Sequence, residues 1–133
     1  MSLYYADTSA VIKLLAEATD SKAFAAFYDG HDDAEWVSSA LLRIEVARVV
    51  LRAVPALLPD ARDLLLAFSY IAIDDDIVDG AMSEPDRGLR SLDAIHLATA
   101  RVLVPELDGL VTYDERLRKA ATDAGLPVIS PRD

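Results

Sequence analysis

This chain contains several short apolar runs, which are separated by longer stretches that mix apolar and polar residues. The runs lie at 3–6, 35–38, 70–73 and 109–112, and their apolar residues mostly follow one another without polar alternation. Continuous runs of this length are typical of strands that are buried on both faces, as in a parallel sheet. We therefore predict strands at these four positions and a short edge strand at 128–129.

The stretches between the runs carry the signals of helix ends. Ser91 is a predicted N-cap, Pro55 and Pro105 predict breaks, and Gly30 and Gly125 predict helix ends. The expected helices lie at 10–17, 21–29, 40–54, 59–68, 74–82, 92–104 and 115–124. Strands that alternate with helices predict an α/β fold of three layers, with a central, mainly parallel sheet of four to five short strands flanked by helices. The pattern leaves the strand order open.

Composition places the chain among ordered globular proteins. Its 133 residues fit one domain, so we expect a single domain over 1–133, and a hydrophobic fraction of 53% suits a packed core. No apolar run approaches the ~20 residues of a membrane-spanning helix, and the N-terminal residues lack the pattern of a signal peptide. With no cysteine, disulfides and thiolate zinc sites are excluded. We expect a cytoplasmic protein without membrane contact.

The charge balance is acidic, with 23 Asp and Glu against 13 Lys and Arg and a formal net charge of −10. This balance argues against a broad basic platform for duplex nucleic acid. It does not exclude a nucleic-acid enzyme, because bound cations invert the local field that a phosphate meets.

Four acidic residues stand at positions where a carboxylate needs an explanation. Asp7 ends the first apolar run, Glu45 interrupts an apolar helical stretch, Asp93 opens a predicted helix and Asp114 closes the run at 109–112. In an open parallel sheet the ends of strands and the starts of the following helices share one edge, where ligands bind. Carboxylates gathered at that edge repel one another unless a positive charge lies between them. We therefore predict a divalent metal site.

The donor set favours Mg²⁺ or Mn²⁺, which prefer oxygen ligands and retain waters that a phosphate can replace. Such ions support attack of water on a phosphodiester without a histidine, cysteine or serine nucleophile. The two histidines, His31 and His96, do not have a zinc-ligand spacing. Three hydroxyl residues lie beside the proposed ligands and are placed to hold a carboxylate or a water: Thr8, Ser9 and, best placed of them, Thr112.

Each acid also has a simpler structural interpretation, and these interpretations stay open on sequence alone. Asp7 and Asp114 can cap helices, Asp93 can serve the helix dipole, and Glu45 can pair with Arg48 on a solvated face. Their joint placement at one predicted edge favours a site. The cluster at 74–76 is expected to be a helix cap and first turn, Asp32, Asp33 and Asp108 are expected in loops or turns, and His96 is expected to be a packed helix residue.

Taken together, these segments resemble PIN-domain nucleases and, among them, the VapC-type toxins of toxin–antitoxin pairs. The matching stretches cover essentially the whole chain: 5–10 around Asp7, the helix with Glu45, Ala47 and Arg48, 89–98 around Asp93, 111–117 around Asp114, and the closing 124–131. The Leu-Asp-Ala-Ile-His-Leu-Ala segment followed by Thr-Tyr-Asp is the most specific of them. No acidic position departs from the family pattern.

The resemblance implies a PIN-like fold and a metal-dependent endoribonuclease whose catalytic residues are Asp7, Glu45, Asp93, Asp114 and Thr112. It implies Mg²⁺ or Mn²⁺ at the acidic site, and products with a 5′ phosphate and a 3′ hydroxyl. We expect Asp7 and Asp93 to bind the ion directly, and Asp114 to bind it directly or through a water. The resemblance also implies an RNA substrate, a cognate antitoxin, and a homodimer that forms a heterotetramer or larger assembly with it. Within this frame we expect Glu45 to hold the attacking water. Contacts with RNA phosphates or an acidic partner are expected from Arg43, Arg48, Arg87, Arg90 and Arg116.

Two other functions fit parts of the pattern. A receiver-like phosphoacceptor also gathers carboxylates at a sheet edge, but it needs an acidic pair after the first strand and a late lysine, and neither is present in the required place. A catalytically weak metal-binding interaction module with a PIN-like fold is the remaining alternative. Loss of one or more of the acids would be its sequence signature, and none is missing.

Overall fold

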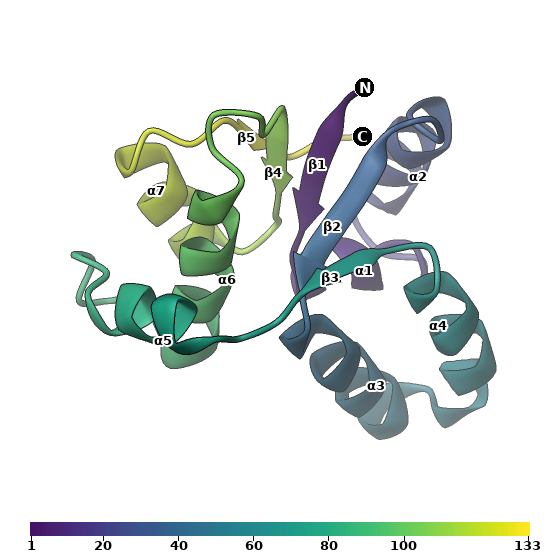
Figure 1. Cartoon of the computed structure of the whole chain (residues 1–133). Coiled ribbons are helices and arrows are strands. Elements are labelled where there is room, and N and C mark those ends of the chain that lie inside the picture. Colours follow the sequence, from purple (N-terminus) through teal and green to yellow (C-terminus); the bar gives the residue numbers. More distant parts are fainter.

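The structure, a computed structural model, describes all residues from 1 to 133 and contains one parallel sheet with helices on both faces (Figure 1). The strands are β1 (Leu3–Ala6), β2 (Glu35–Ser39), β3 (Ser69–Ile71), β4 (Gly109–Val111) and β5 (Val128–Ile129). They run in the order β3-β2-β1-β4-β5, and every neighbouring pair is parallel. All five strands therefore end at the same edge of the sheet, with β1 at its centre. The α/β prediction is confirmed.

Seven α-helices connect and cover the strands. They are α1 (Thr8–Ile12), α2 (Ser21–Gly30), α3 (Leu41–Ala53), α4 (Leu58–Leu65), α5 (Asp75–Met82), α6 (Ser91–Val102) and α7 (Glu115–Asp123), and a 3₁₀ turn, Pro55–Leu57, precedes α4. Figure 1 shows α5, α6 and α7 on one side of the sheet and α1 to α4 on the other. None of these helices is long and apolar enough to cross a membrane.

The alternation of side chains along β1 divides the core into two halves. Tyr4 packs with Phe24, Trp36 and Val46 beneath the helices from α1 to α4, while Tyr5 packs with Leu97 and others beneath α6 and α7. Neighbouring residues of a strand point to opposite faces, so a buried central strand must supply both cores. The fully buried Tyr5 places a phenol hydroxyl inside the second half.

Some predicted boundaries were wrong. The first helix was expected at 10–17, but it begins at Thr8 because the Asp7 side chain accepts a hydrogen bond from the Ala10 N–H. It ends at Ile12, after which Leu14 and Leu15 bond to carbonyls three residues back, so the chain tightens rather than continuing as an α-helix. Ser91 is the first helical residue of α6 rather than its N-cap, which is Arg90. The predicted helix at 59–68 begins one residue earlier and ends at Leu65.

Candidate metal and catalytic site

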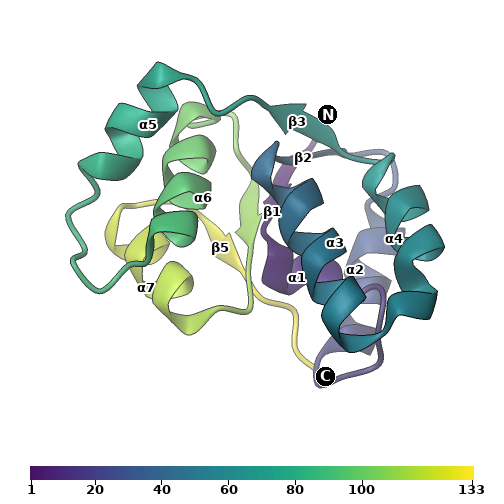
Figure 2. The same cartoon turned by 90° about the horizontal axis from the view of Figure 1, so that it is seen from below.

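The strand-end edge of the sheet is the place where the four predicted carboxylates meet. Figure 2 looks onto this edge from below, with α3 on one side of β1 and α6 on the other. Asp7 follows β1 directly, and Asp114 precedes α7 at the end of the loop after β4. Glu45 lies in α3, and Asp93 lies in the first turn of α6. The topology thus unites residues from four separate parts of the chain.

Asp7 is the most deeply buried of these acids, with 3% of its surface exposed. Its Oδ1 accepts hydrogen bonds from the Ser9 hydroxyl at 2.7 Å and the Ala10 N–H at 3.0 Å, and its Oδ2 accepts one from the Thr112 hydroxyl at 2.6 Å. Burial raises the pKa of Asp7, against the opposing effects of His96 and these hydrogen bonds. A fixed, desolvated carboxylate with an elevated pKa is a candidate for a functional site.

The pKa of Asp93 is affected by the other three acids. Burial, and after it the negative charges of Asp114, Asp7 and Glu45, together raise the pKa of Asp93 to about 6, against the opposing effect of His96. No hydrogen bond within the protein compensates its charge. A carboxylate whose pKa is raised by three others lies in a field of uncompensated negative charge, which a cation would neutralise.

Asp114 caps α7 and opens onto the surface beside Asp93. Its Oδ1 accepts the N–H of Leu117 at 2.9 Å, so the capping interpretation is correct for this oxygen. Asp93 and Asp114 line a wholly polar cavity of about 320 Å³, together with Arg90, Glu115 and Arg116. A lining that combines carboxylates with arginines suits a site for a cation and a phosphate at once.

Glu45 reaches the same edge from α3, and two donors hold it. The Thr8 hydroxyl and the His96 ring nitrogen Nε2 each lie 2.7 Å from its Oε1. Burial would raise the pKa of Glu45, but the hydrogen bond and charge of His96 and the hydrogen bond from Thr8 outweigh it, and the pKa is lowered. Glu45 is therefore ionised at neutral pH, and the alternative interpretation, a pairing with Arg48, is not found.

Thr112 links two of the acids through one hydroxyl group. It is fully buried, donates to Asp7 and accepts the backbone N–H of Asp114 at 3.1 Å. Ser9 adds a second link, because its hydroxyl donates to Asp7 and accepts the N–H of Tyr113 at 2.8 Å. These hydroxyl groups fix the orientation of Asp7 and of the loop that carries Asp114, as supporting groups do around metal ligands.

The acids do not form a closed coordination site. No group of three or more histidine, cysteine, aspartate or glutamate side chains is arranged to hold a metal ion directly. The predicted ligands Asp7 and Asp114 are close enough to Asp93 to raise its pKa, but only Asp93 and Asp114 line the open cavity, while Asp7 is buried.

His96 is the residue of this site that the sequence did not identify. It was expected to be a packed helix residue, and it is indeed buried, with 2% of its surface exposed. It also contacts Glu45 directly. The available signal was its spacing of three residues from Asp93, which places both side chains on one face of α6.

Only some of the remaining candidate residues lie near the carboxylates. Asp74 caps α5 through the Ile77 N–H, as expected, and Asp108 accepts the Leu3 N–H. Of the predicted arginines, only Arg90 and Arg116 line the carboxylate cavity, and Arg43 lies over the ring of Tyr70.

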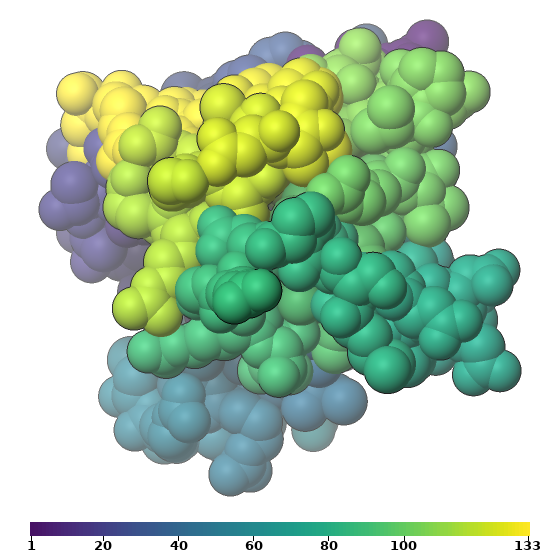
Figure 3. Space-filling model, turned by 90° about the vertical axis from the view of Figure 1, so that its left-hand side faces the viewer, coloured from purple at the N-terminus to yellow at the C-terminus, as the bar shows by residue number.

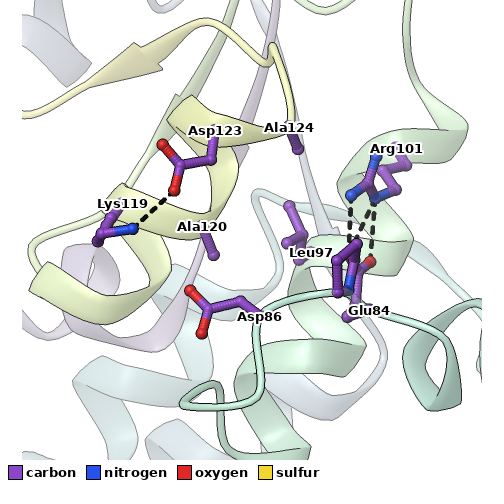
Figure 4. A pocket seen from close by; sticks show the side chains of 9 residues that line it. Glu84, Asp86, Leu97, Arg101, Lys119, Ala120, Asp123 and Ala124 are labelled. Carbon is purple, nitrogen blue, oxygen red and sulfur yellow. Dashed lines mark hydrogen bonds and ion pairs between the residues drawn. The ribbon is translucent and has the colours of Figure 1, made fainter.

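A separate cavity of about 350 Å³ lies between α6, α7 and the loop that follows α5. Figure 3 shows this face, where that loop lies beside α7. Most of its charged side chains pair with one another, Arg101 with Glu84 and Lys119 with Asp123 (Figure 4). Its charges are therefore largely balanced, unlike those of the carboxylate site.

Comparison with known proteins agrees with the fold. Residues 4–123 match the PIN domain family. Ribonuclease VapC35 of Mycobacterium tuberculosis is 39% identical over 131 residues, which cover 97% of each chain. Ribonuclease VapC46 of the same organism is 37% identical over 98% of this chain and 99% of its own. A toxin–antitoxin complex from Klebsiella pneumoniae contains a chain of similar fold, with a TM-score of 0.67, 24% identity, and coverage of 100% of this chain and 99% of that one.

Proposed function

Because this chain belongs to the PIN-domain family, and within it to the VapC branch, we propose that it is an endoribonuclease and the toxin of a toxin–antitoxin pair. Relatives that match nearly the whole chain carry the name ribonuclease. The observation that carries the proposal is the convergence of four acids from separate parts of the chain at the strand-end edge of the sheet. Burial, and after it repulsion by the other three acids, raises the pKa of Asp93 there to about 6. Such repulsion costs stability, which is consistent with a function that requires the acids together.

The donor set fits Mg²⁺ or Mn²⁺. Mg²⁺ commonly uses one or two carboxylates and keeps several waters, so an open arrangement of oxygen ligands suits it better than a closed cage. Asp7, Asp93 and Asp114 would hold the ion. When bound, it would make a water more acidic and offset the negative charge that develops on the phosphodiester.

The protein's own groups would perform the remaining tasks of hydrolysis. Glu45, ionised through its lowered pKa, accepts a hydrogen bond from the attacking water and orients it toward phosphorus. Thr112 and Ser9 hold Asp7 in one rotamer. Attack by water rather than by a ribose hydroxyl leaves a 5′ phosphate and a 3′ hydroxyl.

The ends of the product test this chemistry directly. RNA cut by the purified protein in Mn²⁺ should be a substrate for a 5′-phosphate-dependent exonuclease and should carry free 3′ hydroxyls. Fragments that end in a 2′,3′-cyclic phosphate would show attack by the ribose and would contradict the assignment.

Arg90 and Arg116 are proposed to bind the RNA backbone. Both line the cavity with Asp93 and Asp114, and neither takes part in any ion pair of the protein. A charge-assisted hydrogen bond is worth about 1.5–3 kcal/mol, so each alanine variant should raise KM by about tenfold or more. The control is Arg52→Ala, since Arg52 is an exposed arginine in the last turn of α3. An equal rise in KM for Arg52→Ala would show that Arg90 and Arg116 act only through the net charge of the protein.

The partner is proposed to be an antitoxin with an acidic, amphipathic segment. A groove of about 500 Å³ between α3 and α4 is lined by Ala47, Leu65, Leu66, Phe68 and Tyr70, and its only charged residues are Arg43 and Arg62. Leu66 there is 84% exposed. In a chain of net charge −10, an apolar groove flanked by two arginines fits an acidic partner. Leu66→Glu should weaken the complex in calorimetry without slowing RNA cleavage.

Self-association into a homodimer is proposed through α5 and the start of α6. Val78, Met82 and Leu92 are 40%, 79% and 47% exposed on these helices. Light scattering should give twice the mass of the 14.4 kDa chain, and Met82→Glu should return it to a monomer. A monomeric wild type would contradict the dimer.

A further inference from the structure

A buried histidine connects the two halves of the protein by hydrogen bonds on both of its ring nitrogens. His96 Nδ1 lies 2.6 Å from the hydroxyl of Tyr5, and Nε2 lies 2.7 Å from Oε1 of Glu45. Tyr5 and His96 are 0% and 2% exposed. The hydroxyl of Tyr5 in turn accepts the backbone N–H of Ser39 at 3.2 Å. These contacts run without interruption from the end of β2, through β1 and α6, to α3.

The direction of these bonds follows from the groups themselves. An ionised carboxylate can only accept, so Nε2 must carry the hydrogen that points to Glu45. In the neutral ring Nδ1 then carries no hydrogen and can only accept, so the Tyr5 hydroxyl, which also accepts the Ser39 N–H, donates to it. Tyr5 thereby selects the ring tautomer that presents N–H to Glu45.

The contacts fix Glu45 asymmetrically. His96 and Thr8 both donate to Oε1, while Oε2 has no hydrogen-bond partner in the protein. A glutamate side chain on a helix otherwise samples several rotamers, and ordering it costs conformational entropy. The two donors on Oε1 hold the Glu45 side chain between α3 and α6, and they leave Oε2 for a ligand.

A purely structural histidine would satisfy its nitrogens with backbone carbonyls or water, as buried polar groups usually do. His31 illustrates this case, because its Nδ1 bonds to the carbonyl oxygen of Phe27. His96 instead bonds with a carboxylate at the strand-end edge.

We propose that His96, oriented by Tyr5, is a positioning residue that holds Oε1 of Glu45 so that Oε2 meets the attacking water. This proposal rests on the proposed ribonuclease function. His96 itself does not touch the substrate, and its effect passes entirely through Glu45.

The test is a double-mutant cycle on RNA cleavage in Mn²⁺. His96→Leu should lower kcat by about 10–100-fold with KM nearly unchanged, as loss of a supporting group does. His96→Gln, which can place an amide N–H near the position of Nε2, should recover a large part of that loss. In a Glu45→Gln background, His96→Leu should cost little more. Equal losses in both backgrounds would overturn the proposal.

Tyr5→Phe provides a second variant that removes a single oxygen atom, in case His96→Leu does not fold. It should lower kcat less than His96→Leu, and again only when Glu45 is present. NMR of the two histidine rings supplies a readout that does not depend on activity. The Nε2–H resonance of His96, assigned by its loss in His96→Gln, should shift in Glu45→Gln and in Tyr5→Phe.

The outcomes separate this proposal from the function on which it rests. A wild type that cuts RNA together with an unaltered kcat in folded His96→Leu would refute the positioning role alone. A wild type that cuts no RNA in Mn²⁺ would refute the ribonuclease function, and the positioning role with it. An Nε2–H resonance insensitive to Glu45→Gln would refute the hydrogen bond itself.

Discussion

Replacing Asp93 by Asn should stabilise the metal-free protein, because it removes a charge that its neighbours repel. Burial and the charges of Asp114, Asp7 and Glu45 raise the pKa of Asp93 from 3.8 to about 6. A shift of this size corresponds to about 3 kcal/mol, at 1.36 kcal/mol per pKa unit. Asp93 is half-buried, so solvent screening reduces the figure to about 1.5 kcal/mol.

The helix dipole opposes part of this gain. A carboxylate in the first turn of α6 is favourable by about 0.3–1 kcal/mol, which Asn forfeits. The net expectation is therefore about 1 kcal/mol of added stability, or roughly 3 °C in Tm for a domain of this size.

The sign of the pH dependence follows from the raised pKa. Between about pH 4 and 6 the folded protein binds more protons at Asp93 than the unfolded chain does, so the stability of the wild type falls as pH rises through this window. The advantage of Asp93→Asn should be complete above pH 6 and should shrink as pH falls toward 4.

Thermal melts in EDTA at pH 7.5 and pH 4.5 measure the effect. Asp76→Asn is the matched control, because Asp76 is an exposed acid in the first turn of α5. It should leave Tm unchanged or slightly lower. If Asp93→Asn is no more stable than the wild type at pH 7.5, the acids do not repel one another as the geometry requires.

Two further substitutions test the supports of the site and the sheet. Thr112→Val removes the hydroxyl that donates to Asp7, so it should lower the free energy of unfolding in urea by about 1–3 kcal/mol and should also slow cleavage. Retained activity with lowered stability would limit Thr112 to a structural role. Gly109→Ala would place a Cβ against the side chain of Ile129 and close to Tyr4, and it should destabilise the protein by about 1–3 kcal/mol in the same assay. An unchanged unfolding midpoint would contradict the close approach of β4 and β5.

Much of the fold could be predicted because its signals are local. Continuous apolar runs predicted all five strands to within a few residues, and Gly30 and Gly125 lie at or just beyond helix ends, as predicted. Strand order depends instead on which strand pairs with which across the sheet. The centre of that order is β1, because Tyr4 and Tyr5 fill both cores, and no local pattern reveals this.

The site was predictable as a set of acids but not as a set of contacts. The acids stood out because each interrupts or ends an apolar segment. The roles of His96 and Tyr5 could not be derived, since a tyrosine in a strand and a histidine in a helix are ordinary core residues until the fold places them 2.6 Å apart. Long-range polar contacts of this kind leave no periodic trace in a sequence.

The most direct test of the central claim is cleavage of RNA by three proteins, the wild type, Asp93→Asn and Asp76→Asn, each with Mn²⁺ and with EDTA. The carboxylate site predicts cutting by the wild type and Asp76→Asn in Mn²⁺, and none by Asp93→Asn or by any protein in EDTA. Cleavage by Asp93→Asn at the wild-type rate would contradict the site. The absence of cutting by all three in Mn²⁺, with tight binding to a partner, would instead favour an interaction module.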